Sequence, residues 1–313
     1  MIDVTFCVHD TGEYLKHTAV AIVSILENTK ADVTIHLIHD STVKKMSILK
    51  LKQMVFSYHQ QIRFYEINEE YFKNLADEIK SSTKGKSFSI GTLFRLKLAE
   101  LLSLDKVLYL DSDIVVNMDL AELWKVKLDS YYVAAVLDLK DTRHKITNRI
   151  HFFKMNISHS RYFNAGVILF NLKTIRYKID MLEESVEFLK RNPKDAIFFD
   201  QDALNYLFQG ECILLESRYN FMPVALPEWK VHSDLKAIIH FAGPKPWKYI
   251  CSRFDYLYWF YLSKTPWGNS IDNLLTLQRD LQIDLGYSLF SGKIGSRRML
   301  IKGILYRVLH WSC

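Results

Sequence analysis

Apolar and polar positions alternate in regular blocks along the first part of the chain. The apolar segments Ile2–Val8, Val33–His39 and Ile62–Ile67 predict strands. Between them, apolar residues recur at helical spacing from about Thr18 to Leu26 and from about Thr42 to Ser57. Strands and helices in this order predict parallel pairing with right-handed crossovers. In such sheets, ligands bind beyond the carboxyl ends of the strands.

The remaining elements follow a less regular pattern. Predicted strands are Tyr131–Leu137, Phe163–Leu172, Cys212–Glu216 and Lys236–Phe241, and predicted helices are Thr92–Leu102, Leu120–Trp124, Leu182–Arg191 and one that opens at Asp200. The segment Asn68–Lys86 predicts a helix and a mobile loop. Residues 139–161 are rich in Lys, Arg and His and lack a clear period, so we expect a loop over a binding site there.

The sequence KVLYLDSDIVVN, Lys106 to Asn117, carries the strongest chemical signal. Its apolar run predicts a buried strand that leaves the core at Asp111 and Asp113. Side chains two residues apart in an extended segment point the same way, so the two carboxylates can converge on one hard cation, with Ser112 between them. An isolated Asp-x-Asp is weak, because it also occurs in surface turns. The apolar frame on both sides favours a metal site.

A third candidate metal ligand, His240, ends a later predicted strand. Two carboxylates and one imidazole suit Mn²⁺ and also accept Mg²⁺. His240 alone is more typical of a hydrogen-bonded core histidine. Gly243 and Lys245 follow closely, and a glycine followed by a lysine is typical of phosphate binding. Lys245 alone is equally compatible with a solvated surface lysine.

Composition limits the class of protein. Of 313 residues, 49% are hydrophobic and 24% are charged, which excludes a disordered chain. Four cysteines without a C-x-x-C pair encode neither a zinc knuckle nor a disulfide framework, so we expect a reducing, cytoplasmic environment. No signal peptide and no apolar run of about 18 residues are found, so we expect no transmembrane segment. The net charge of +6 is modest, and we expect no nucleic-acid partner.

Six motifs in order resemble those of glycosyltransferase family 8. They are FCVHD, FRLKLAE, KVLYLDSDIVV, FNAGVILFNL, DQDALN and HFAGPKPW, and they span about residues 2–250. The family is retaining and metal-dependent, and it includes glycogenin and bacterial lipopolysaccharide α-galactosyl- and α-glucosyltransferases. The resemblance implies an α/β fold, a Rossmann-like GT-A nucleotide-sugar-binding domain with a mixed central sheet.

The resemblance also implies roles for individual residues. Asp111, Asp113 and His240 match the family's metal ligands, and Asp200 and Gln201 match its catalytic pair beside the anomeric carbon. Donor-binding positions are matched by Cys7, Asp10, Tyr14, Arg95, Ser112, Asp138, Asn164, Ala165, Gly243 and Lys245. Taken alone, an Asp at the start of DQD is more typical of a helix N-cap.

The resulting hypothesis is a retaining hexosyltransferase that uses a UDP-hexose, glucose or galactose, and a divalent ion. Its acceptor would be a glycan, glycolipid or glycoprotein. Two alternatives stay open. A sugar-phosphate nucleotidyltransferase shares the fold style and the metal, although no Gly-rich basic loop follows the first strand. A nucleotide-sugar-binding protein without turnover is the non-enzymatic alternative.

We predict a catalytic domain at residues 1–265 and a helical extension at 266–313. Residues 288–313 contain five Lys or Arg and no Asp or Glu, with apolar residues at helical spacing between them. This pattern is typical of a basic amphipathic helix on an anionic membrane surface, here the inner face of the plasma membrane. The alternative is that the apolar stripe packs on the catalytic domain or on a second subunit.

Overall fold

The structure is a computed structural model, and it describes residues 1–11, 13–82, 90–139, 145–223, 235–248, 252 and 254–268. Most of the predicted C-terminal extension lies outside the described residues, and so does the basic segment 288–313. No helix within the described residues is long and apolar enough to cross a membrane.

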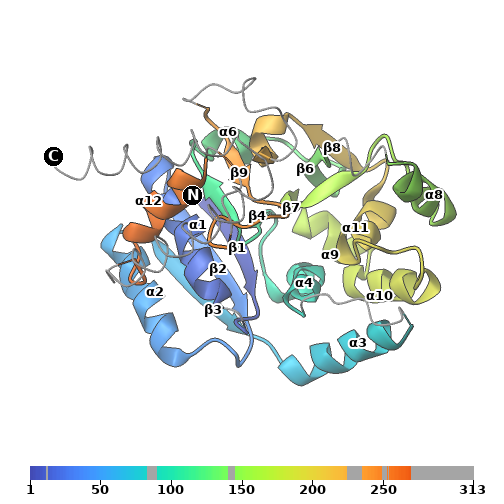
Figure 1. Cartoon of the computed structure of the whole chain (residues 1–313), viewed down its shortest axis with the longest axis horizontal. Coiled ribbons are helices and arrows are strands. Elements are labelled where there is room, and N and C mark those ends of the chain that lie inside the picture. The colour runs from blue at the N-terminus through green and yellow to red at the C-terminus, as the bar shows by residue number, and fades with distance from the viewer. Residues whose placement is uncertain are drawn as a thin grey trace, which may run out of the picture.

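A mixed sheet forms the centre of the molecule (Figure 1). Its strands are β1 (Ile2–Val8), β2 (Val33–His39), β3 (Gln61–Glu66), β4 (Val107–Leu110), β6 (Val133–Leu137), β7 (Phe163–Phe170) and β8 (Cys212–Leu215). Among the described residues, the order across this sheet is β3-β2-β1-β4-β7-β6-β8. Strand β7 runs antiparallel to both of its neighbours, and the other neighbouring pairs are parallel. The mixed sheet predicted from the sequence is therefore confirmed.

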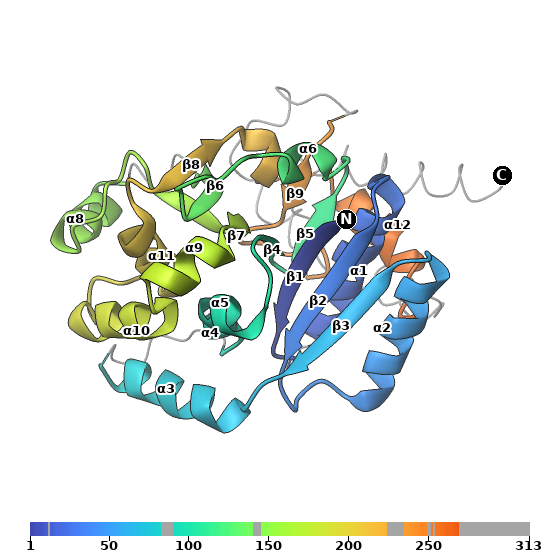
Figure 2. The same ribbon diagram turned by 180° about the vertical axis from the view of Figure 1, so that it is seen from behind.

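Helices cover both faces of the sheet (Figures 1 and 2). They are α1 (Tyr14–Asn28), α2 (Lys45–Ser57), α3 (Glu69–Ser82), α4 (Gly91–Phe94), α5 (Leu98–Leu101), α6 (Ala121–Trp124), α8 (Ile146–Lys154), α9 (Leu172–Lys178), α10 (Met181–Arg191), α11 (Asp200–Phe208) and α12 (Asp255–Ser263), with 3₁₀ turns η1 (Arg95–Lys97) and η2 (Ser217–Asn220). Successive side chains of β4 point into two different core clusters, Leu108 into one and Tyr109 into the other. The sheet is therefore buried on both faces, as its near-continuous apolar strands require.

The buried strand predicted within the KVLYLDSDIVVN motif is β4. Strand β4 ends at Leu110, and after Asp111, Ser112 and Asp113 the chain enters β5 (Ile114–Val116), which pairs with β9 (Ile238–His240) in a separate small sheet. The prediction that the buried strand leaves the core at Asp111 and Asp113 is confirmed. Asp111 and Asp113 therefore lie in the turn that connects the main sheet to the small sheet.

Three predictions need correction. The predicted helix Thr92–Leu102 is divided by the 3₁₀ turn η1, which contains Arg95. The predicted loop at 139–161 contains α8, whose apolar residues face both the core and solvent and so give no single stripe. The strand predicted to reach Leu172 ends at Phe170, because the Asn171 side chain accepts a hydrogen bond from the Thr174 N–H and caps α9.

The first β-α-β-α-β unit is confirmed, with β1, β2 and β3 parallel. Helix α1 begins at Tyr14, four residues before the predicted start. The Asp10 carboxylate accepts a hydrogen bond from the Leu15 N–H at 2.8 Å, which satisfies one of the free donors of the first turn. Asp10 therefore fixes the start of the helix that lies nearest to the acidic turn.

Candidate active site

The acidic turn and β9 bring three potential metal ligands together. Register pairing sets His240 opposite Ile114, immediately after Asp113. The His240 Nε2 atom lies 3.4 Å from an Asp113 oxygen and 3.8 Å from an Asp111 oxygen. One ligand atom from each of the three residues lies within 4.8 Å of the others. Asp113 and His240 are buried, and Asp111 is partly exposed, so the cluster opens to solvent on the Asp111 side.

Basic side chains balance the two carboxylates. Arg95 Nη2 lies 3.0 Å from Asp111 Oδ1, and the Tyr109 hydroxyl donates to the same oxygen at 2.6 Å. The ammonium of Lys245 donates to Asp113 Oδ2 and, at 3.0 Å, to the Phe241 carbonyl. Burial alone would raise the pKa of Asp113, but Lys245 and His240 outweigh it and hold this pKa well below its usual range. Asp113 is therefore a carboxylate at any physiological pH.

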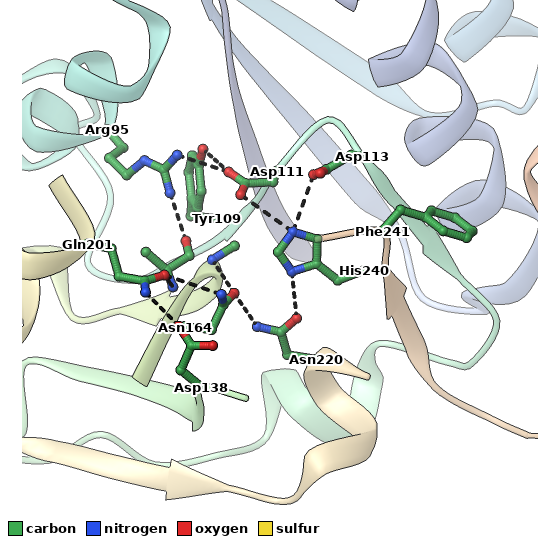
Figure 3. A network of polar contacts seen from close by, with 12 residues as sticks. Arg95, Tyr109, Asp111, Asp113, Asp138, Asn164, Gln201, Asn220, His240 and Phe241 are labelled. Carbon is green, nitrogen blue, oxygen red and sulfur yellow. Dashed lines mark hydrogen bonds and ion pairs between the residues drawn. The ribbon is translucent and has the colours of Figure 1, made fainter. Parts of the chain in front are cut away.

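A chain of side-chain amides fixes the orientation of His240 (Figure 3). The backbone N–H of Gly166 donates to the Asn164 side chain at 2.9 Å, so the atom that it meets must be an oxygen. That oxygen also accepts from Asn220 at 2.8 Å, so Asn220 presents its amide nitrogen there and its own oxygen to His240 Nδ1, at 2.9 Å. His240 Nδ1 therefore carries a proton, so in the neutral imidazole the lone pair is on Nε2, which faces the carboxylates.

Backbone contacts also fix the orientation of Gln201, at the other end of this series of side-chain amides. The backbone N–H of Ala165 donates to the Gln201 side-chain oxygen at 2.9 Å, and the Asn164 amide donates to the same oxygen at 3.2 Å. The Gln201 nitrogen then donates to Asp138 at 2.6 Å and to the Tyr162 hydroxyl at 3.1 Å. Two neighbouring N–H groups of β7 thus set the direction of every amide between Asp138 and His240 (Figure 3).

Gly166 allows this close approach. A Cβ atom added there would lie 2.2 Å from His240 Cε1 and 2.9 Å from Asp111 Oδ2, well inside van der Waals contact. Strand β7 also pairs with the acidic turn, because the Asp111 N–H donates to the Gly166 carbonyl at 2.9 Å. The glycine in FNAGVILFNL is therefore required by the fit of the histidine ring against the strand.

The start of α11 adds two buried carboxyls. Arg95 bridges Asp111 and Asp200, because its Nε lies 3.2 Å from Asp200 Oδ2, as an ion pair without a hydrogen bond. Burial raises the pKa of Asp200 to about 6, with Asp111 adding to the shift and Arg95 opposing it. Burial also raises the pKa of Asp202 to about 7, although Tyr162 and the Phe198 N–H hydrogen-bond to its carboxylate. Burial likewise raises the pKa of Asp138.

Hydrogen bonds and ion pairs join most of the predicted site residues into one network. Its predicted members are Arg95, Asp111, Asp113, Asp138, Asn164, Ala165, Asp200, Gln201, His240 and Lys245. The Arg95 side chain links its parts, since it also donates to the Ala165 carbonyl at 2.8 Å. The network brings together η1, the β4–β5 turn, β7, α11 and β9.

The predicted nucleotide-binding residues lie around the edge of this network. Cys7 on β1 is close to Arg95 and Asp111, and burial raises the pKa of its thiol well above its usual range. Ser112 accepts a hydrogen bond from Thr18 of α1 at 2.8 Å. Burial opposes the raised pKa of Lys245. Asp113 raises this pKa, and the nearby Tyr14 phenol adds a smaller effect in the same direction.

Two predicted donor-binding residues have mainly backbone roles here. The Asp10 carboxylate accepts from the Leu15 N–H in the first turn of α1, and the Asp10 N–H donates to the Thr42 hydroxyl at 2.7 Å. Gly243 has a φ of 101°, a conformation that favours glycine, with open space around the position of a Cβ. An open backbone of this kind suits close approach by a ligand.

Sequence reasoning missed several members of the network. Tyr109 stands inside the central motif, and its phenol beside an Asp-x-Asp was an available signal. Asp202 stands in the DQD motif, and it joins the network through the Tyr162 hydroxyl. Asn220 and Tyr162 have no local signal, because Asn220 contacts residues 20 and 56 positions away in the chain. Their roles follow from tertiary contacts alone.

The donor set fits a divalent ion. Two carboxylates and an imidazole with a free lone pair are ligands that Mn²⁺ accepts. The Asn220 contact to Nδ1 supplies the outer hydrogen bond that metal-bound histidines usually make. In this structure the ammonium of Lys245 balances the charge of Asp113.

The chain resembles known proteins in both sequence and fold. The model of the family described as glycosyl transferase family 8 matches residues 4–251. A putative glycosyltransferase of Haemophilus influenzae is 26% identical over 249 residues, which cover 77% of this chain and 72% of that protein. A lipopolysaccharide 1,2-glucosyltransferase of Escherichia coli is 30% identical over 249 residues, which cover 75% of this chain and 70% of that enzyme.

A solved structure gives the same result for the fold. The galactosyltransferase LgtC, in complex with donor and acceptor sugar analogues, matches with a TM-score of 0.72 and 28% identity. The match covers 85% of this chain and 96% of the LgtC chain. It confirms the GT-A fold that the sequence predicts.

Proposed function

The chain belongs to glycosyl transferase family 8, and on that premise we propose that it moves glucose or galactose from a UDP-sugar to a glycan or glycoconjugate acceptor. As a member of the family it is a glycosyltransferase. The convergence of Asp111, Asp113 and His240 within 4.8 Å is the observation that most supports this donor type. A nucleoside diphosphate leaves as an anion, and a cluster that holds a divalent ion meets that need.

Asp111, Asp113 and His240 would hold the divalent ion, with Mn²⁺ preferred and Mg²⁺ accepted. Bound there, the ion would act as a Lewis acid that neutralises the departing diphosphate. Lys245 lies beside Asp113 and keeps its positive charge, because its pKa is raised by that carboxylate. Its ammonium is within reach of a phosphate placed next to the cluster.

Retention of the anomeric configuration fits a same-face substitution. The bond from C1 to the phosphate oxygen breaks, the bond from C1 to the acceptor oxygen forms on the same face, and the acceptor proton passes to the departing phosphate. The Gln201 amide is too weak a nucleophile for a double displacement. The Asp200 carboxylate is held in an ion pair with Arg95. We assign Gln201 and Asp200 to orienting the sugar.

The side chains that would bind the donor substrate fall into two groups. Asn164, Ala165 and Asp138 line the sugar end of the amide chain, and Asp138 locks the Gln201 amide through a hydrogen bond of 2.6 Å. Cys7, Asp10, Tyr14, Ser112 and Gly243 lie on the nucleotide side. The acceptor would be a surface glycan, such as lipopolysaccharide, because one of the relatives is a lipopolysaccharide glucosyltransferase.

A panel of UDP-sugars tests this function. The purified protein is incubated with each UDP-sugar and Mn²⁺, and UDP release is measured without acceptor. We expect slow release from UDP-glucose or UDP-galactose, its loss in EDTA, and a fall of at least about a hundredfold in Asp113→Asn, because that variant removes a metal ligand. The product formed with acceptor should show an α anomeric coupling by NMR.

Other outcomes would identify the rival functions. Pyrophosphate formation from UTP and a sugar phosphate would favour a nucleotidyltransferase. Tight UDP-sugar binding without turnover would favour a binding protein. Undiminished UDP release in EDTA would contradict the metal assignment, and a β coupling would contradict retention.

We place this activity in the cytoplasm, at the inner face of the plasma membrane, where a lipid-borne acceptor would be met. Residues 1–265 would carry the catalytic site, and 266–313 would form the membrane-directed extension. The site residues described above all lie between Cys7 and Lys245, which supports this division.

A further inference from the structure

The side-chain amide of Gln201 uses its whole hydrogen-bonding capacity within the protein. An amide oxygen accepts two hydrogen bonds and an amide nitrogen donates two. The oxygen accepts from the Ala165 N–H at 2.9 Å and from the Asn164 amide at 3.2 Å. The nitrogen donates to Asp138 Oδ2 at 2.6 Å and to the Tyr162 hydroxyl at 3.1 Å. The protein itself therefore sets the direction of this amide (Figure 3).

Tyr162 is the most deeply buried of these partners of Gln201. Its side chain is fully buried, and its ring stacks on the Phe152 ring of α8, with the two centroids 4.3 Å apart and the planes 24° apart. Close packing leaves a ring in this position no room to swing away. The hydroxyl of Tyr162 therefore stays at a fixed place beside the Gln201 nitrogen.

Asp202 fixes the direction of the Tyr162 hydroxyl. Because the Gln201 nitrogen can only donate, the Tyr162 oxygen must accept from it. The hydrogen of the Tyr162 hydroxyl is then left for Asp202 Oδ1, at 2.7 Å. Asp202 is fully buried, and its Oδ2 accepts from the Phe198 N–H at 2.7 Å, which keeps the carboxyl group from turning away. These hydrogen bonds therefore run in one direction, from Gln201 through Tyr162 to Asp202.

We propose that Tyr162 is a positioning residue for Gln201, and that Asp202 orients the Tyr162 hydroxyl for this task. The proposal rests on the role proposed above for Gln201, which is to orient the donor sugar. Without the hydroxyl, one N–H of Gln201 loses its acceptor, and the amide can tilt about its other contacts. A small misplacement of a group beside the reacting atoms slows the chemical step.

The effect of Tyr162 should be confined to the sugar end of the site. Among the residues that the structure describes, its hydroxyl forms hydrogen bonds with Gln201 and Asp202 and none with the three candidate metal ligands. Metal and nucleotide binding therefore do not depend on it directly. The expected loss is in kcat and not in the affinity for Mn²⁺ or UDP.

The variant Tyr162→Phe tests the proposal in the full chain, because it keeps the ring and removes only the hydroxyl. We expect kcat for UDP release from a UDP-sugar to fall by about tenfold or more, because Gln201 is misplaced. The dissociation constants of Mn²⁺, and of UDP in the presence of Mn²⁺, should stay within about twofold of those of the unaltered protein. Isothermal titration calorimetry measures both constants.

A measurement without any substrate reports on the amide itself. In protein labelled with ¹⁵N-glutamine, the side-chain NH₂ signals of Gln201 are assigned by their loss in Gln201→Glu. Hydrogen exchange at this NH₂ group should be at least about fivefold faster in Tyr162→Phe, the factor that one ordinary hydrogen bond contributes. If the unaltered protein released no UDP from any UDP-sugar, the transfer function would be wrong, and the exchange rates would still decide the role of Tyr162.

Tyr261→Phe is the matched control. Tyr261 of α12 is also buried, and its hydroxyl accepts a hydrogen bond from Asn28 at 2.7 Å, outside the site network. Both variants should lower the melting temperature by similar amounts, but Tyr261→Phe should keep the kcat and the Gln201 exchange rate of the unaltered protein. The proposal would be overturned if Tyr162→Phe matched Tyr261→Phe in kcat or in Gln201 exchange, or if its UDP affinity fell as far as its kcat.

Discussion

Asn220 determines which nitrogen of His240 faces the acidic turn. Its amide is held by Asn164, whose own orientation is fixed by the Gly166 N–H, so Asn220 presents an oxygen to His240 Nδ1. Because the proton is thereby kept on Nδ1, Nε2 stays free to bind a cation. Asn220 acts through His240 and is a positioning residue.

Replacing Asn220 by Leu should weaken metal binding. Without the amide, the imidazole can rotate or carry its proton on Nε2, and loss of such an outer hydrogen bond costs about 10- to 100-fold in metal affinity. The dissociation constant of Mn²⁺ can be measured from the electron paramagnetic resonance signal of the free ion. The control is Asn205→Leu, which removes another buried amide that bonds only backbone groups of Phe163 and Gln201. Equal Mn²⁺ affinities in the two variants would contradict the positioning role.

Gly166→Ala should disrupt the cluster by steric contact. The new methyl group would meet His240 Cε1 at 2.2 Å, so the ring or β7 must move. We expect UDP release and Mn²⁺ binding to fall together. Gly210→Ala is the comparison, since Gly210 has a φ of 88° but open space around it, and strain there costs about 1 kcal/mol of stability. A Gly166→Ala protein with normal Mn²⁺ affinity would show that the site adapts to a larger residue.

Among the secondary-structure elements, the first turn of α11 makes the stability of the folded protein depend on pH. The pKa of Asp202 is raised to about 7 by burial, whereas an unfolded Asp titrates near 3.9. The folded state therefore holds this proton over a range in which the unfolded state has released it. The stabilisation is complete below about pH 4 and is lost as the pH rises through about 7, and it amounts to roughly a few kcal/mol.

Asp202→Asn should remove this dependence. The variant cannot ionise at position 202, so its melting temperature should fall less than that of the unaltered protein between pH 5 and pH 8. Thermal denaturation followed by circular dichroism at both pH values measures the difference. Parallel decreases in the two proteins would mean that the Asp202 carboxyl titrates normally in the folded state.

Helices and strands were predicted well where their buried side chains recur at a regular spacing. Strands β1 and β2 were located to the residue, because an apolar run between turn residues has one interpretation. Helix α8 was missed, because it exposes Ile150 and Phe153 while it buries Phe152. The break at η1 was missed as well, since the sequence around Arg95 has an ordinary helical period.

At the scale of the whole molecule, the site lies where the parallel and antiparallel parts of the sheet meet. Strand β4 pairs in parallel with β1 and antiparallel with β7, and the acidic turn leaves the sheet from β4. The residues that we assign to the sugar come from β7 and α11, on one side of this junction. The residues that we assign to the nucleotide come from β1 and α1, on the other side. On this assignment, the two halves of the donor would be met by the two halves of the fold.

Removing residues 288–313 separates catalysis from attachment. We expect donor hydrolysis to stay nearly intact, because the described site residues all precede this segment. Binding to anionic liposomes and transfer to lipid-borne acceptors should both fall, since five basic residues are lost. If the truncated protein bound such liposomes as well as the full chain at low salt, the segment would have to be assigned to packing or oligomerisation.

Most of the strands and helices in their order, the family and the three candidate metal ligands were predicted from the sequence alone. These follow from local periodicity and from residue types that few other sites need, such as two carboxylates inside an apolar frame. Only the tertiary structure decided the bend that separates β4 from β5, the tautomer of His240 and the direction of the Gln201 amide. Each depends on contacts between residues far apart in the chain, such as Asn220 with Asn164, and local pattern carries no record of such contacts.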